Sequence, residues 1–270
     1  MSFIGSRLAL LTASVDVDAT SWRAAVLAAG GSVSDSQFQR ISRLIRSLKG
    51  AGIWALLDRL WLHAAESSVQ GLVDLKARTV ATAVNSPAFA INRGFTGDGA
   101  SSYLNLNFSL STQAVAANVA NIEFGGWVLT NVSGTMSLLS GANSANAGVR
   151  LRPRGTTSLI AGEPNATLTS GAISTGDSRG LTSTYRNGSA GAVCGFNKNG
   201  VLTETFTPTT FAGSLSNLNI YGLASNSNGT TAEFYTGQVA MLFIGAAGVH
   251  NATFYNLIHA YLLAVGAVSS

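Results

Sequence analysis

The stretch Arg93-Gly-Phe-Thr-Gly-Asp-Gly-Ala-Ser-Ser-Tyr-Leu-Asn-Leu-Asn-Phe108 divides the chain into two parts of different character. Before it, short segments follow helical spacing and are rich in Arg, Leu and Trp. After it, short β-type runs are separated by Gly, Asn, Ser and Thr. Three glycines surround Asp98 and predict a tight turn, because glycine adopts backbone conformations that strain other residues. We expect this stretch to be the entry to a β domain, with Tyr103–Phe108 as its first strand.

Candidate strands follow at short, regular intervals, which is typical of a β-sandwich or barrel. They are Tyr103–Phe108, Ile122–Asn131, Met136–Ser140, Val149–Pro153, Thr157–Ala161, Leu181–Arg186, Gly191–Phe196, Leu202–Phe206, Asn217–Ala224 and Glu233–Ile244. Asn187-Gly188 and Asn199-Gly200 each predict a two-residue type I′ hairpin, since that turn needs positive φ at both positions. No repeat of 20–50 residues is visible, which argues against a propeller or solenoid.

The N-terminal part predicts three helices. The first runs over about 21–29, with Asp18 or Thr20 as its cap. Ser34-Asp-Ser-Gln37 fits a capping box and precedes an amphipathic helix with arginines on one face and apolar residues on the other. A third helix is expected over Ile53–Ala64, and another near the C-terminus over 251–265. We therefore divide the chain into a helical anchor or assembly region (1–65), a connector packed on the sandwich (66–93) and a β-sandwich domain (94–270).

Charged residues make up only 10% of the chain, against roughly 25% in typical soluble domains. Residues 1–93 carry the whole formal charge of +4, because the acidic and basic residues of the remainder balance. A charge of +4 is modest beside the clustered basic patches of nucleic-acid-binding proteins, so nucleic acid is an unlikely partner. A surface poor in charge suits a virion protein or a subunit that is buried in an assembly.

Catalytic motifs are missing from the sequence: it contains no G-x-S-x-G, no P-loop and no H-E-x-x-H. Glu123, Glu163, Asp177, Glu204 and Glu233 are scattered singly, whereas sandwich glycosidases place their carboxylates together along one strand. The chain is expected to be no enzyme and to need no cofactor. Cys194, the only cysteine, lies in an apolar run and is expected to be a buried thiol. The apolar runs are too short for a signal peptide or a membrane span.

The order of several short motifs resembles phage and prophage virion proteins with a helical N-terminal region and a concanavalin-like, laminin-G-like jelly roll. The motifs are Gly50-Ala-Gly-Ile-Trp-Ala55, Phe95-Thr-Gly-Asp-Gly-Ala-Ser-Ser-Tyr-Leu104, Gly125-Gly-Trp-Val-Leu129, Tyr185-Arg-Asn-Gly188 and Asn217-Leu-Asn-Ile-Tyr-Gly-Leu-Ala224. The resemblance covers residues 18–265. It implies an antiparallel jelly-roll sandwich and a non-enzymatic virion subunit of the tail, baseplate or head. Some relatives in that family recognise host-surface glycans.

Two groups of residues are candidates for binding. Arg150, Arg152 and Arg154 alternate with apolar residues, so in a strand they would share one face and could contact an acidic polysaccharide or subunit. Protection of an edge strand by charge would explain them equally well. Tyr185 could be an aromatic platform for a glycan; Trp127 could as well, although a Trp in mid-strand more often belongs to the core. The candidates for an assembly interface are Arg40, Arg43, Arg46, Trp54 and Trp61.

No metal site is expected. Asp98 and Asp177 are the only loop carboxylates that could hold calcium, and Ca²⁺ takes 6–8 oxygen ligands. Turn formation by these two residues is the simpler interpretation. His63, His250 and His259 are far apart in the sequence, and His63 and His259 are both expected within helices.

Two functions therefore stay open, a virion structural subunit and a carbohydrate-binding adhesin, with a glycan-cleaving enzyme disfavoured. The expected partners are other virion proteins, further copies of the chain and a host-surface glycan. The expected location is the virion, after synthesis in the host cytoplasm.

Overall fold

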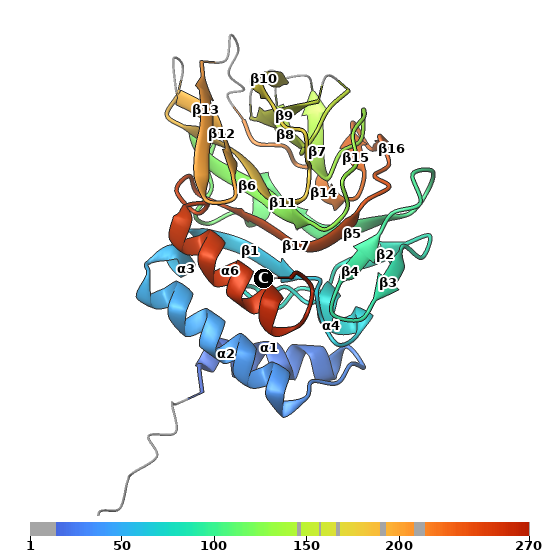
Figure 1. The fold of residues 1–270 in the computed structure, drawn as a ribbon, viewed down its shortest axis with the longest axis vertical. Helices are drawn as coiled ribbons and strands as arrows, with labels where there is room; N and C mark the ends of the chain where they lie inside the picture. The colour runs from blue at the N-terminus through green and yellow to red at the C-terminus, as the bar shows by residue number, and fades with distance from the viewer. Residues whose placement is uncertain are drawn as a thin grey trace, which may run out of the picture.

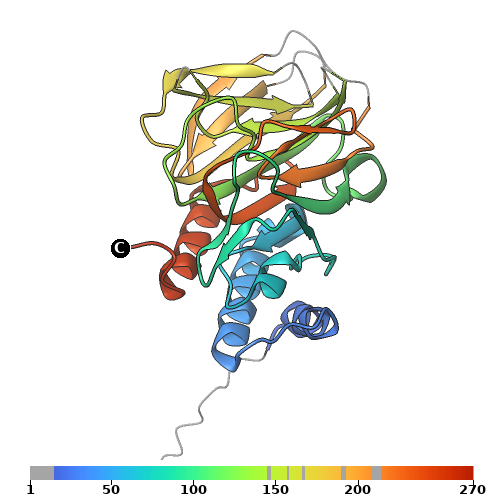
Figure 2. The ribbon, with the colours of Figure 1, turned by 90° about the vertical axis from the view of Figure 1, so that its right-hand side faces the viewer.

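The computed structural model describes residues 15–144, 147–156, 158–165, 168–189, 193–207 and 214–269. They form three layers: a group of helices, a sheet that contacts the helices, and a second sheet stacked on the first (Figures 1 and 2). We call the first sheet the inner sheet and the second the outer sheet. This arrangement confirms the predicted mainly β sandwich with an N-terminal helical region and a C-terminal helix.

The inner sheet follows the order β13-β12-β11-β6-β17-β4-β3, and β1 also pairs with β17. All of its pairings between described strands are antiparallel. Its strands are β1 (Leu57–Leu62), β3 (Ala88–Ala90), β4 (Gly94–Thr96), β6 (Asn121–Val128), β11 (Gly180–Asn187), β12 (Val193–Lys198), β13 (Val201–Phe206) and β17 (Gln238–Gly245).

The outer sheet follows the order β10-β9-β8-β7-β14-β5-β2, and β15 and β16 form a hairpin attached to β7. Its strands are β2 (Thr82–Val84), β5 (Tyr103–Ser109), β7 (Leu139–Ser144), β8 (Ala147–Arg152), β9 (Leu159–Pro164), β10 (Thr169–Ser174), β14 (Asn219–Gly222), β15 (Ser225–Ser227) and β16 (Thr230–Ala232).

The stretch from Arg93 to Phe108 is where the chain crosses from the inner to the outer sheet. Its first part is β4, which pairs with β17, and its last part is β5, which pairs with β14 and β2. Between them Asp98 Oδ1 accepts hydrogen bonds from three successive backbone N–H groups, those of residues 100–102. Gly94 has φ +96°, and a Cβ there would lie 2.1 Å from the carbonyl oxygen of Val239. The predicted turn is confirmed, and glycine is required where β4 approaches β17.

The helices are α1 (Val17–Ala28), α2 (Asp35–Gly50), α3 (Ile53–Leu56), α4 (Ser68–Leu72), α5 (Leu110–Gln113) and α6 (Ala252–Ala264). Helix α1 begins earlier than predicted because Asp16, not Asp18 or Thr20, caps it. The Ser34 hydroxyl accepts from the Gln37 N–H as expected, but the Gln37 side chain donates to the Tyr261 hydroxyl of α6 instead of completing the capping box. No helix among the described residues is long and apolar enough to cross a membrane.

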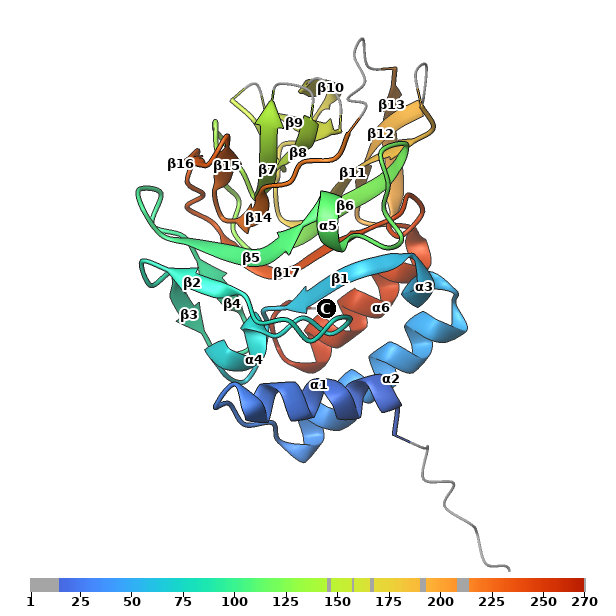
Figure 3. The same ribbon diagram turned by 180° about the vertical axis from the view of Figure 1, so that it is seen from behind.

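Two hydrophobic cores stabilise the three layers. One lies between the sheets and includes Phe108, Phe124 and Leu242. The other lies between the inner sheet and the helices and joins the apolar face of α2 to α6 and to Trp127 and Phe243. Figure 3 shows α6 between α2 and the inner sheet. The helices therefore pack as a third layer on the sandwich.

The predicted third helix is wrong beyond Leu56. Residues 57–62 form β1, which pairs with β17, and His63 follows this strand and lies outside any helix. Leu60 and Leu62 face the helical core, while Trp61 faces the core between the sheets. A segment that is apolar on both faces fits helical and strand spacing equally well, and pairing with β17 decided between them.

Only one of the two predicted type I′ turns forms. Asn199 and Gly200 have φ +50° and +81° and join Lys198 to Val201 as a two-residue turn. Asn187 instead pairs with Val193 as the last residue of β11, so the connection spans residues 188–192. Residues 190–192 of this connection lie outside the described residues, and they include the first two residues of the predicted strand Gly191–Phe196. The two strands still form the expected antiparallel pair.

Candidate functional site

A row of polar and aromatic side chains crosses the outer face of the outer sheet. The register places one member on each of six neighbouring strands: Glu163 on β9, Arg150 on β8, Ser140 on β7, Tyr221 on β14, Asn105 on β5 and Thr82 on β2. Val149 and Leu151, the chain neighbours of Arg150, point the opposite way into the core. With about 4.8 Å between strands, the row is about 24 Å long. We call these six residues the outer-face row.

Charged side chains gather at the β8–β9 end of the row. Arg150 Nε lies 3.5 Å from Glu163 Oε2, and Arg150 Nη1 lies 3.6 Å from Glu233 Oε1. Arg152 also pairs with Glu233 Oε1, and the Ser137 hydroxyl donates to the other oxygen of the same carboxylate. Both oxygens of Glu233 are therefore held by the protein.

Besides Nε of the Arg150 guanidinium, two oxygen atoms of the outer-face row are buried and have no hydrogen-bond partner among the described residues. They are the hydroxyl oxygen of Ser140 and Oε1 of Glu163, on side chains that flank Arg150 on either side. Glu163 is 2% exposed and Ser140 is fully buried. A buried polar group without a partner costs roughly 1–3 kcal/mol. This end of the row therefore holds a carboxyl, a hydroxyl and a guanidinium whose hydrogen bonds are not all met by the described residues.

Burial also controls the charge of Glu163. It raises the pKa of this carboxyl to about 7, and the ionised Glu233 nearby raises it further, although the arginines 150 and 152 act in the opposite direction. Near neutral pH Glu163 is consequently divided between its protonated and ionised forms. It can donate or accept one hydrogen bond accordingly.

Two tyrosines lie beside the charged end of the row. Tyr221 pairs across the sheet with Ser140, and its ring contacts that of Tyr103 on β5 with a centroid distance of 4.5 Å and an interplanar angle of 33°. Both side chains are partly exposed. The row thus joins an aromatic surface to hydrogen-bonding groups, the combination that binds the apolar and hydroxyl faces of a sugar.

The sequence placed three arginines on one strand face, and the structure places two of them there. Arg150 and Arg152 lie on the outer face of β8, but the strand ends at Arg152. Arg154 donates to Asn131 and Ser158 in the loops that follow. Strand β8 is flanked by β7 and β9, so protection of a sheet edge does not explain its arginines.

Tyr185, the other candidate for glycan binding, lies on the opposite sheet. It belongs to β11 and lines a pocket of about 270 Å³ on the helix-facing side of the inner sheet, together with Glu123, Asn197 and His250. It cannot form one site with Arg150 and Arg152, because the sandwich core lies between them.

Glu123, in that second pocket, is fully buried and its hydrogen bonds are satisfied. Oε1 accepts from the Ser183 hydroxyl (2.7 Å) and the Asn197 amide (3.0 Å), and Oε2 accepts from the backbone N–H groups of residues 248 and 250. The Gly200 N–H donates to His250 Nε2, so the proton of this ring sits on Nδ1 and is donated to the Ser183 hydroxyl. In this tautomer His250 is therefore a donor to Ser183 and not a base that would activate it as a nucleophile. Burial raises the pKa of Glu123 to about 7 and lowers that of His250 to about 3.

The residues considered for an assembly interface separate into two groups. Trp61 is fully buried and Trp54 nearly so, and neither side chain is accessible to a partner. Arg40, Arg43 and Arg46 lie along the solvent side of α2, and the first two line a small pocket of about 140 Å³ against α6. Among the described residues, no carboxylate forms an ion pair with these three arginines.

The two loop carboxylates have local partners. Asp98 accepts the backbone hydrogen bonds of its own turn, which hold the pKa of its carboxyl well below the usual range. Asp177 pairs with Arg179, with 2.7 Å between Oδ2 and Nη2. Within the described ranges no three His, Cys, Asp or Glu side chains gather as metal ligands would. Cys194 is buried as predicted, and burial raises its pKa to about 11.

Comparison with known proteins gives a likeness only at the level of the fold. No family model matches this sequence, and no curated protein is similar enough to count as a match. Among solved structures, domain 4 of AbnA, a GH43 extracellular arabinanase from Geobacillus stearothermophilus in complex with arabinotriose, is 13% identical with a TM-score of 0.45. The match covers 74% of this chain and 97% of that one. The receptor-binding domain of a botulinum neurotoxin C/D mosaic serotype is 10% identical with a TM-score of 0.49, over 77% and 51% of the two chains.

A third match is the CBM40 of the IT-sialidase from Ruminococcus gnavus. It is 14% identical with a TM-score of 0.37, over 51% of this chain and 84% of that one. Because identities and TM-scores are this low, we base the functional proposal on the chain's own residues.

Proposed function

We propose that this protein is a carbohydrate-binding β-sandwich that binds a host-surface glycan along the outer-face row. The observation that carries the proposal is the pair of buried, unpartnered oxygens of Ser140 and Glu163 on either side of Arg150, with Tyr221 beside Ser140 on the next strand. A sugar presents adjacent hydroxyl groups that both donate and accept. One hydroxyl can donate to Glu163 while its neighbour accepts from Arg150, and the sugar's apolar face rests on the tyrosine.

The rest of the row supports an extended ligand. Asn105 and Thr82 continue the line of polar groups away from the charged end, and exposure increases in that direction. A row of about 24 Å is longer than one sugar ring. An oligosaccharide that runs across the strands would contact several members at once.

We propose binding without cleavage. Glycoside hydrolysis needs one carboxyl as an acid and a second as a free nucleophile or base. Glu163 could supply the acid, but both oxygens of Glu233 are engaged by Arg150, Arg152 and Ser137. Release of reducing sugar from a bound polysaccharide by the purified protein would contradict this part of the proposal.

The test is a glycan array, followed by calorimetry on the best ligand with two matched variants. Tyr221→Ala removes a ring of the outer-face row, and we expect affinity to fall about 2- to 13-fold, the equivalent of an aromatic contact of 0.5–1.5 kcal/mol. Tyr185→Ala removes a tyrosine of the opposite sheet and should leave affinity unchanged. If Tyr185→Ala weakens binding and Tyr221→Ala does not, the pocket around Glu123 is the site and the outer-face row is not.

We further propose, as a second function compatible with the first, that the chain is a structural subunit of a phage or phage-like particle, in the tail, baseplate or head. The supporting observation is the arginine face of α2, which has no ion-pair partner among the described residues and could contact an acidic neighbour, either another virion protein or a second copy. Replacing Arg40, Arg43 and Arg46 together by Gln should reduce incorporation into particles, measured by immunogold electron microscopy. Full incorporation of this variant would contradict the role of α2.

A further inference from the structure

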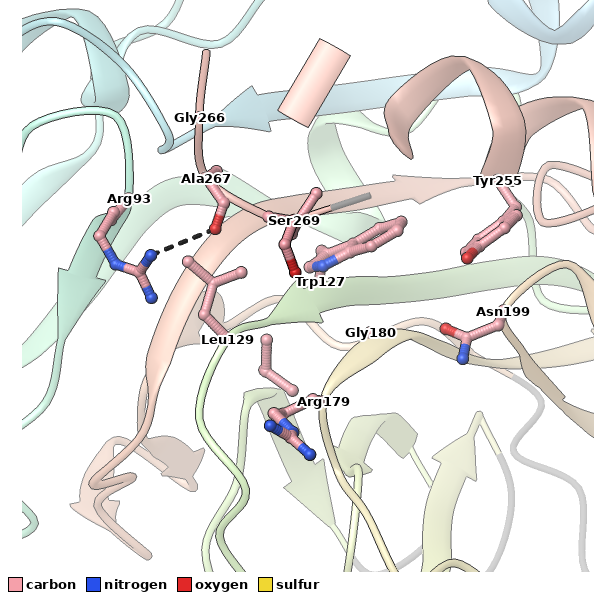
Figure 4. A pocket seen from close by; sticks show the side chains of 12 residues that line it. Arg93, Trp127, Leu129, Arg179, Gly180, Asn199, Tyr255, Gly266, Ala267 and Ser269 are labelled. Carbon is pink, nitrogen blue, oxygen red and sulfur yellow. Dashed lines mark hydrogen bonds between the residues drawn. The ribbon is translucent and has the colours of Figure 1, made fainter. Parts of the chain in front are cut away.

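A second cavity is separate from the outer-face row. It has a volume of about 520 Å³ and lies on the helix-facing side of the inner sheet (Figure 4). Its walls come from Arg93 before β4, from β6, the 179–180 and 199 turns, α6 and the segment after α6. Polar and aromatic side chains of the lining are those of Arg93, Trp127, Arg179, Asn199, Tyr255 and Ser269.

Trp127 supplies an unused donor to this cavity. Its side chain is 4% exposed, and its ring stacks near-parallel to Tyr255 and His259 of α6, with centroid distances of 5.3 and 5.6 Å. These contacts cover the ring and leave the nitrogen edge turned toward Arg93 (Figure 4). The indole Nε1–H has no acceptor among the described residues. The nitrogen is not among the buried unpartnered atoms, so water or a ligand in the cavity can reach this donor.

Three further side chains are fixed in place and each keeps a donor free. Arg93 donates from Nε to Gln238 and from Nη1 to the carbonyl of residue 267, and its Nη2 has no described partner. Arg179 is oriented by Asp177 through Nε and Nη2. Asn199 accepts from the Leu181 N–H through Oδ1, which leaves its NH₂ group as a donor.

The cavity is therefore rich in donors and poor in acceptors. No Asp or Glu belongs to its described lining, and the nearest carboxylate, Asp177, is neutralised by Arg179. The Arg93 guanidinium is then the one uncompensated charge, which favours a single negative charge over a phosphate dianion. Leu129 and Val268 add apolar surface beside these donors.

We propose that this cavity binds a small carboxylate with a ring-sized body, held by the Trp127 indole N–H and the Arg93 guanidinium. The carboxylate accepts from both groups, with Arg179 and Asn199 at the rim, and the body of the ligand lies against Leu129 and Val268. The site is independent of the outer-face row, because the two lie on opposite faces of the sandwich.

The test uses two carboxylates and their neutral counterparts: benzoate beside benzyl alcohol, and glucuronate beside glucose. Titration of the full chain is followed by the ¹H–¹⁵N signal of the Trp127 indole, which Trp127→Phe assigns by its disappearance. We expect at least one carboxylate to shift this signal with a Kd of millimolar order or tighter, near −4 kcal/mol, and its neutral counterpart to leave it in place.

Variants separate the two contacts. Arg93→Gln should weaken carboxylate binding about 10- to 100-fold, the usual effect of a lost charged hydrogen bond. Trp127→Phe keeps an aromatic ring in the stack with Tyr255 and His259, although a smaller one, and removes the N–H; about a 5-fold loss is expected by calorimetry. Arg23→Gln, a distant surface change on α1, and Tyr221→Ala on the other face are the controls and should bind as wild type does. Absence of a shift with both carboxylates, equal shifts with the neutral compounds, or wild-type affinity in Arg93→Gln would each overturn the proposal.

Discussion

The outward faces of the two sheets each carry a buried glutamate, in opposite settings. Glu123 on the inner sheet and Glu163 on the outer sheet both have a pKa raised to about 7, chiefly by burial. Glu123 accepts four hydrogen bonds, two of them from the backbone before α6. Glu163 has a 3.5 Å ion pair with Arg150 and an oxygen with no described partner.

The difference shows which observation separates structural from functional acids here. Burial and a shifted pKa are common to both residues and do not distinguish them. Hydrogen bonding does, because Glu123 connects the inner sheet to the loop before α6 and leaves nothing for a ligand to satisfy. Glu163 lies under a face that no long helix covers, and its free oxygen is the reason that we place the binding site there.

The largest change in the free energy of unfolding should follow a substitution that disrupts the packing of the helices on the inner sheet. Phe254 of α6 is fully buried against Phe243, with 5.1 Å between ring centroids, so Phe254→Ala should lower the free energy of unfolding by about 3–5 kcal/mol. Tyr221→Ala, on the uncovered face, should change it by no more than about 1 kcal/mol. Urea denaturation followed by circular dichroism measures both. Equal losses would show that the outer face also carries packing that stabilises the fold.

The two glutamates should differ in the same assay by a smaller amount. Glu123→Ala leaves two backbone N–H groups, an amide and a hydroxyl without their acceptor, and we expect a loss of about 2–4 kcal/mol. Glu163→Ala removes a carboxylate that is poorly satisfied, and Arg150 keeps Glu233 as its second partner, so stability should stay within about 1 kcal/mol of wild type. A loss at Glu163 as large as that at Glu123 would mean that Glu163 is a structural residue, and the proposed binding site would lose its central argument.

The sequence correctly predicted those strands and turns that are determined by neighbouring residues in the chain. The alternation of Val149 and Leu151 with arginines predicted β8, and Asn199-Gly200 predicted its turn. The same rules failed at Leu57–Leu62, where an apolar segment between two cores fits a helix as well as a strand. They also failed at Asn187-Gly188, where pairing with Val193 continued the strand.

The binding site itself could be predicted only in part. Arg150 and Arg152 were found from their spacing in one strand. Glu163, Ser140 and Tyr221 join them through the register of three strand pairs, β8–β9, β7–β8 and β14–β7. Glu233 joins them from the connection between β16 and β17. In the sequence these residues are isolated, and nothing local marks them as neighbours. Tyr185 carried a stronger local signal and lies on the other sheet.

The smallest effect is in the pH dependence of stability. Because the folded pKa of Glu163 is about 7 and its unfolded value is 4.5, the folded state keeps a proton that the unfolded state releases. The resulting stabilisation is complete below pH 4.5 and is lost as the pH rises through 7. His63 and His250 act in the opposite sense, since burial lowers their pKa to about 4 and about 3, and their contribution is lost as the pH falls below 6.5. The pH profile of wild type alone therefore mixes opposing terms.

Comparison with Glu163→Gln isolates one carboxyl, because the histidines contribute equally to both proteins. At about 1.4 kcal/mol per pKa unit, Glu163→Gln should gain roughly 1–3 kcal/mol on wild type between pH 4.5 and 8. Glu123→Gln should show the same trend on top of a constant loss, because an amide cannot accept all four hydrogen bonds. A constant difference between Glu163→Gln and wild type across this range would mean that Glu163 is solvated and ordinary. A ligand would then find no buried carboxyl to satisfy at that end of the outer-face row.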